Sequence, residues 1–147
     1  MKKAIKIIIF VLIFFALITK LGYVFMPRYI TFDIIKSYMK MPKNSIDVLF
    51  VGDSDLYSGI SPMELYQKYG ITSANYGSPA ASNILMYYML KEALTTQSPK
   101  VVIMNGTTIF NETESEGMRA QAVDLMPNDA VKWELINDQN YNFSLQD

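Results

Sequence analysis

Residues 45–55 read Ser-Ile-Asp-Val-Leu-Phe-Val-Gly-Asp-Ser-Asp, and this stretch decides the fold of the chain. Its centre, Val48–Val51, is a continuous apolar run rich in β-branched and aromatic residues. A run that is too short for a buried helix predicts a strand covered on both faces. The run ends in the turn Gly52-Asp53-Ser54. Chemistry in open parallel sheets gathers beyond the carboxyl ends of the strands, so the Ser54 hydroxyl lies where a nucleophile is expected.

The same turn also has a purely structural interpretation. Gly52 lets the backbone bend tightly and lets a ligand approach closely. Asp53 and Ser54 are residue types that hydrogen-bond nearby backbone amides in turns. Gly-Asp-Ser tripeptides are common in loops, so this stretch alone favours a capping role over a catalytic one.

Two further apolar runs continue the pattern. Ile71–Tyr76 and Val101–Met104 are expected as strands, and each is followed by a turn rich in glycine and hydroxyl residues. A helix capped at Ser82 or Asn83 and running to about Leu94 is predicted between them. The alternation of strand and helix predicts an α/β fold with a parallel sheet and right-handed βαβαβ crossovers.

The helix between the first two strands has the clearest local signals. Ser61 is a typical N-cap, Pro62 suits the first helical position and Glu64 completes a capping box. Gly70 is suited to end the helix in a left-handed conformation. A short helix of about two turns is therefore predicted over residues 62–69.

Residues 1–30 are expected to form a membrane anchor. Lysines at positions 2, 3 and 6 precede an apolar run over residues 7–18 that has no polar face. No small-residue cleavage site follows, and the apolar character continues to Met26, interrupted only by Lys20. These features predict an uncleaved signal-anchor, with the lysine-rich end in the cytoplasm and the rest of the chain outside.

The remaining segments are less informative. Residues 31–44 are expected as a connector that packs loosely or stands at the membrane surface, and residues 45–147 as one incomplete α/β domain. A helix is expected over Asn128–Ile136, with Trp133 and Ile136 on its apolar side. Glutamates occupy a hydroxyl-rich loop, where a solvated loop is favoured over a cation site: Glu112, Glu114 and Glu116.

Composition limits the chemistry. The chain contains no cysteine, which excludes disulfides and thiolate metal sites, and no histidine, so a Ser-His-Asp triad cannot be completed within it. The first 30 residues carry five Lys or Arg and no acid, whereas the remainder carries 8 basic against 14 acidic residues. This asymmetry favours membrane orientation, and no basic patch indicates nucleic-acid binding.

The three turns together resemble the SGNH (GDSL-like) hydrolase superfamily. Gly52-Asp53-Ser54 is similar to its first block, with Ser54 as the nucleophile, and Gly77 to its second block, whose glycine amide helps to hold an oxyanion. Residues 101–108 are similar to the third block, but Thr108 stands where that family has an asparagine. The fourth block, Asp-x-x-His, is missing. The resemblance implies a flavodoxin-like half-domain, with Asp53 and Asp55 supporting the turn.

Within the superfamily, the chain looks most similar to membrane-anchored, DltD-like proteins and to SGNH proteins of polysaccharide O-acetylation. The resemblance implies a serine esterase or acyltransferase acting on acyl groups of cell-surface glycans or teichoic acids. The membrane and a membrane-bound O-acyltransferase are the expected partners, and no cofactor or metal is expected. Two alternatives stay open. The chain is a non-catalytic scaffold or binding subunit of such a complex, or a truncated product without activity.

Overall fold

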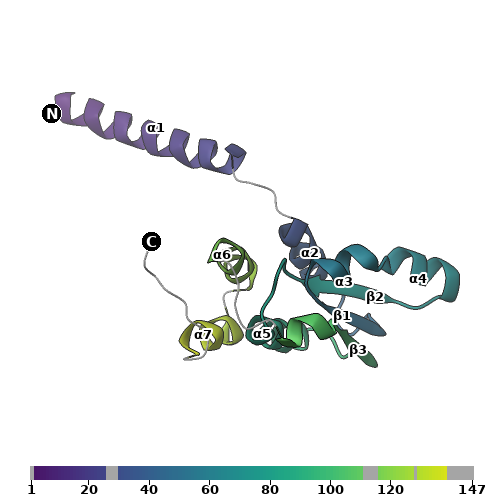
Figure 1. Ribbon diagram of the computed structural model, residues 1–147. Coiled ribbons are helices and arrows are strands. Elements are labelled where there is room, and N and C mark those ends of the chain that lie inside the picture. Colours follow the sequence, from purple (N-terminus) through teal and green to yellow (C-terminus); the bar gives the residue numbers. More distant parts are fainter. Residues whose placement is uncertain (1, 26–29, 111–115, 128, 139–147) are drawn as a thin grey trace.

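A computed structural model of the chain describes residues 2–25, 30–110, 116–127 and 129–138 (Figure 1). Within these ranges it contains three strands, seven α-helices and one 3₁₀ helix. Their bounds in chain order are α1 (Lys2–Phe25), α2 (Ile30–Met39), β1 (Val48–Gly52), α3 (Ser54–Gly59), α4 (Pro62–Tyr69), β2 (Ser73–Gly77), α5 (Asn83–Ala93), β3 (Val101–Met104), η1 (Gly106–Phe110), α6 (Glu116–Leu125) and α7 (Ala130–Asn137).

The three strands form one parallel sheet in the order β2-β1-β3. Each strand lies on a run that the sequence predicts, and the α/β class with a parallel sheet is confirmed. β1 is the central strand: its Val48 is level with Ser73 of β2 and with Val101 of β3. The carboxyl ends of all three strands therefore lie at the same edge of the sheet.

Helices cover the two faces of β1 differently (Figure 1). Leu49 and Val51 belong to a core that includes side chains of α2 and α5. Alternate residues of a strand point to opposite faces, so Gly52 faces the other side, where a Cβ added to it would lie 2.9 Å from Leu56 Cβ of α3. β1 and β2 are thus covered by α3 and α4 on one face and by α2 and α5 on the other.

Helix α2 is more deeply packed than the sequence suggests. Ile35 and Tyr38 are buried, and the Tyr38 ring lies 4.5 Å from the ring of Tyr76 in β2, centroid to centroid. The Tyr38 hydroxyl also donates a hydrogen bond to Ala93 O at the end of α5. The prediction that residues 31–44 pack loosely is wrong, because the aromatic side chain of this segment fills the core beside β2.

The N-cap, the proline at the first position and the C-cap of α4 are confirmed, whereas the capping box is not, because the Glu64 side chain bonds to Lys68 and not to the amide of Ser61. Ser61 Oγ accepts a hydrogen bond from Glu64 N, and Gly70 adopts the left-handed conformation with φ 68°. The Glu64 side chain pairs with Lys68 one turn later, at 3.4 Å. The signals of α5 are confirmed as well, since Ser82 caps it.

The helix expected over residues 128–136 is observed as α7, but its apolar side is different. Val131 and Leu135 are buried, whereas Trp133 is 56% exposed. The assignment of Trp133 to the apolar side is therefore wrong. α7 packs on α5, and the position of its neighbour, rather than the largest side chain, selects the buried face.

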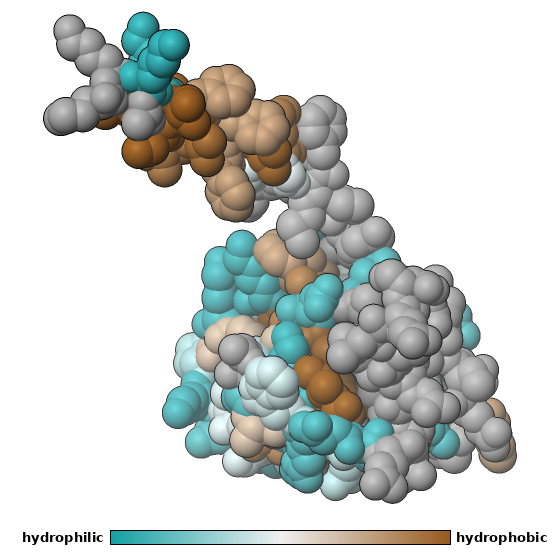
Figure 2. Space-filling model, turned by 90° about the vertical axis from the view of Figure 1, so that its left-hand side faces the viewer, coloured by the Kyte–Doolittle hydropathy of each residue, from teal (hydrophilic) through white to brown (hydrophobic). Residues whose placement is uncertain are grey.

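Helix α1 is long and apolar enough to cross a membrane, over residues 5–22. At about 1.5 Å per residue, its 24 residues extend to about 36 Å, which exceeds a bilayer core. Every side chain of α1 for which the structure describes burial is exposed. Figure 2 shows hydrophobic side chains along α1, whereas the coloured part of the body in view is mostly hydrophilic around a hydrophobic strip.

Candidate functional site

The candidate site lies at the carboxyl end of β1. Ser54 is the first residue of α3, directly after the strand, and it is half-buried. Within the part of the chain that the structure describes, the Ser54 hydroxyl has no hydrogen-bond partner. The serine is therefore placed at the sheet edge where the sequence predicts it, with its hydroxyl available.

Asp53 is the N-cap of α3, as the structural interpretation of the turn predicts. Its Oδ1 accepts a hydrogen bond from Asp55 N at 3.1 Å. The same oxygen accepts a second bond from Asn105 Nδ2 at 2.7 Å. Through these two bonds, Asp53 positions the turn that carries Ser54.

Asn105 is a site residue that the sequence analysis missed. It follows β3, and its amide N–H donates to Val51 O, so β3 and β1 are joined up to the level of the turn. Its side-chain oxygen accepts hydrogen bonds from Thr107 N and Thr107 Oγ1, at 3.1 and 2.9 Å. Asn105 therefore links the turn after β3 to Asp53, one residue before Ser54. Its position directly after the third strand was the available signal.

A second asparagine supports the other end of α3. Asn75 Nδ2 of β2 donates to Tyr57 O and Ile60 O, at 3.3 and 3.1 Å. These carbonyls lie at the C-terminal end of the helix, where no intrahelical donor remains for them. α3 is thus fastened to β3 at its start and to β2 at its end. No feature of the sequence indicated this role of Asn75.

Gly77 lies beside Gly52 in the sheet register. A Cβ on Gly77 would overlap the carbonyl oxygen of Gly52 and lie 3.0 Å from its carbonyl carbon. The amide that donates to Gly52 O is that of Ser78, at 3.2 Å. Close backbone approach therefore explains why glycine occupies position 77, and its role as an oxyanion donor stays a prediction.

The remaining predicted residues are partly described. Asp55 is exposed in the first turn of α3. Thr108 lies in η1, but the placement of its side chain is outside the described part, as are Glu112 and Glu114. Among the described residues, no cluster of three or more His, Cys, Asp or Glu could hold a metal ion. A shallow apolar cavity of about 300 Å³ lies between α2, α4 and β2, and Ser54 is not among its lining residues.

Comparisons with known proteins give no match: no protein-family model, no curated protein and no solved structure resembles the chain.

The link from Asn105 to Asp53 carries a testable consequence. Replacing Asn105 with alanine removes a bond to a charged group and is expected to lower the free energy of unfolding by about 1.5–3 kcal/mol. Denaturant unfolding of the detergent-solubilised full chain, followed by circular dichroism, measures this loss. Asn137→Ala is the control, because its exposed side chain bonds to Trp133 O within the same helix, and the substitution should cost under about 1 kcal/mol. Equal losses in both variants would contradict the assigned role.

Proposed function

We propose that the chain is the nucleophile-bearing part of a membrane-anchored, extracytoplasmic serine esterase or acyltransferase of the SGNH type. Its substrates are acyl groups on cell-surface glycans or teichoic acids, and α1 anchors it with its lysine-rich end in the cytoplasm. The observation that supports this proposal is the half-buried Ser54 hydroxyl at the carboxyl end of the central strand, which has no hydrogen-bond partner among the described residues. Asp53, Asn105 and Asn75 hold the helix that carries it.

In this chemistry Ser54 Oγ attacks the carbonyl carbon of an ester, and the alcohol leaves to give an acyl-enzyme. Water or an acceptor hydroxyl then takes the acyl group and regenerates the serine. A base must take the serine proton, because an alcohol is a poor nucleophile at neutral pH. The chain has no histidine, so we assign the base to residues outside these 147, on a further segment or on a membrane-bound O-acyltransferase partner.

A second candidate is a non-catalytic scaffold subunit of a complex that modifies envelope polysaccharides. Two observations favour it: the absence of histidine, and the exposure of β3 at the sheet edge. All four β3 side chains are apolar and between 37% and 49% exposed, from Val101 to Met104. An apolar edge strand of this kind is suited to pairing with another polypeptide.

Labelling with a fluorophosphonate separates the two functions. In membranes of the source cell, where partners are present, the probe is expected to label the wild-type chain and to leave Ser54→Ala unlabelled. Ser58→Ala is the matched control, since this exposed serine lies four residues later in the same helix and should not affect labelling. An unlabelled wild-type chain that still assembles with membrane proteins would favour the scaffold. An immunoblot of the same membranes shows whether the base lies on the same polypeptide, as a band well above 16.8 kDa.

A further inference from the structure

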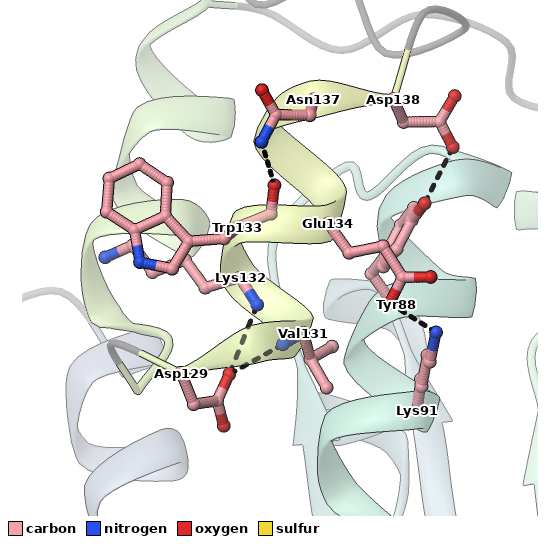
Figure 3. A network of polar contacts seen from close by, with 9 residues as sticks. All are labelled: Tyr88, Lys91, Asp129, Val131, Lys132, Trp133, Glu134, Asn137 and Asp138. Carbon is pink, nitrogen blue, oxygen red and sulfur yellow. Dashed lines mark hydrogen bonds and ion pairs between the residues drawn. The ribbon is translucent and has the colours of Figure 1, made fainter.

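Helix α7 is held on α5 by polar contacts around an apolar centre (Figure 3). Tyr88 Oη of α5 donates to Asp138 Oδ2 at 2.8 Å, and Lys91 forms an ion pair with Glu134. Beneath them, Val131 and Leu135 are buried against the core. Both polar contacts lie at the partly exposed rim of the interface between α5 and α7.

A carboxyl group is buried under this interface. Glu92 of α5 is only 1% exposed, and its Oε2 has no hydrogen-bond partner among the described residues. The group that faces it from α7 is the carboxyl of Asp129, the N-cap of that helix. Asp129 Oδ1 accepts hydrogen bonds from Val131 N and Lys132 N, at 3.0 and 3.2 Å. An ionised carboxylate is suited to accept both bonds. Glu92 is therefore the member of the pair suited to hold a proton.

Among the described side chains, those around Glu92 do not neutralise a negative charge. Tyr38 of α2 and Tyr76 of β2 face it, and burial raises the pKa of both hydroxyls, that of Tyr38 to about 12. Ala122 and Val123 of α6, and Met126 directly after it, contribute apolar side chains to this core. The nearby lysines have other partners: Lys91 pairs with Glu134, and Lys132 Nζ donates to Met126 O at 3.5 Å.

Desolvation is the largest cause that raises the pKa of Glu92, from 4.5 to about 7, and the facing Asp129 adds to it. Two carboxylates facing each other in the interior repel when both are ionised. One proton between them removes the repulsion and allows the two groups to hydrogen-bond.

We propose that Glu92 and Asp129 form a proton-dependent clasp, which holds α7 on α5 when Glu92 is protonated and loosens it when both carboxyls are ionised. The sign follows from linkage. Glu92 exposed by opening of α7 has its ordinary pKa and releases its proton, whereas Glu92 in the closed clasp keeps it. Opening is therefore opposed most strongly at low pH and becomes easier as pH rises from about 4.5 to 7, with no further change above that.

Hydrogen exchange of the full chain in detergent micelles tests the clasp. The protection of α7 amides, corrected for the intrinsic exchange rate and divided by that of β1, is expected to fall about tenfold per pH unit between about pH 5 and 7. Above about pH 7 the ratio should be constant.

Three variants separate the clasp from ordinary packing. Glu92→Gln keeps the shape without the titration, so its protection ratio is expected to be independent of pH. Asp129→Asn keeps an N-cap residue but removes the facing charge, and should move the plateau to lower pH; it decides the question if Glu92→Gln does not fold. Glu134→Gln removes the exposed ion pair and should keep the wild-type slope. A wild-type ratio that is constant from pH 5 to 8, or an unchanged slope in Glu92→Gln, would overturn the proposal.

Discussion

Gly77→Ala is expected to destabilise the domain by about 3 kcal/mol, the upper end of the usual cost of overpacking. The added Cβ meets the Gly52 backbone, which a rotamer change cannot move aside. Gly52 is fixed in turn, because it belongs to the central strand and its carbonyl accepts the Ser78 amide. Relief would require β1 and β2 to separate at the edge that carries Ser54. Denaturant unfolding followed by circular dichroism measures the loss.

Gly59→Ala is the matched control for this substitution. Gly59 is the last residue of α3, and a Cβ added there would have no heavy atom within 4 Å. Because alanine favours helix over glycine, we expect a change within about 1 kcal/mol, and a stabilising one. If Gly77→Ala were as stable as Gly59→Ala, the close approach of the two strands would be refuted.

The features that sequence predicted well are those governed by neighbours in the chain. Ser61, Pro62 and Gly70 fix the ends of α4 through bonds and backbone angles within a few residues. The β1 run is apolar because the strand is covered on both faces, and its sequence shows this directly. Interactions between residues a few positions apart can be predicted from the sequence alone.

The features that sequence missed depend on contacts between distant segments. Tyr38 is buried because Tyr76 lies beside it, 38 positions later, and Trp133 is exposed because α5 contacts the opposite side of α7. In the site, Ser54 and Asp53 follow β1 and were found by position. The role of Asn105 could be predicted only by knowing that the turn after β3 lies beside the carboxylate of Asp53. The order of the strands in the sheet decides which turns lie side by side, and this order cannot be read from a single sequence.

Val51→Ala is expected to lower the free energy of unfolding by about 2–3 kcal/mol, whereas Val102→Ala should cost under about 1 kcal/mol. Both substitutions remove the same two methyl groups, each worth about 0.8 kcal/mol when buried, and a cavity adds to the loss only in a closed core. Val51 is fully buried in the central strand, and Val102 is 37% exposed in β3. The two side chains point to the same face of the sheet. The difference between the two losses therefore measures how well other side chains cover each valine.

The same pair of variants, measured in native membranes, distinguishes a free edge strand from an occupied one. Thermal aggregation of the full chain in those membranes gives an apparent midpoint for each variant. If β3 is free, Val102→Ala should leave the midpoint unchanged, while Val51→Ala lowers it by several degrees. If Val102→Ala lowers the midpoint as much as Val51→Ala only in native membranes, another polypeptide covers β3 there. Since β3 ends beside Asn105, such a polypeptide would lie next to the turn that carries Ser54, where the proposed catalytic base is required.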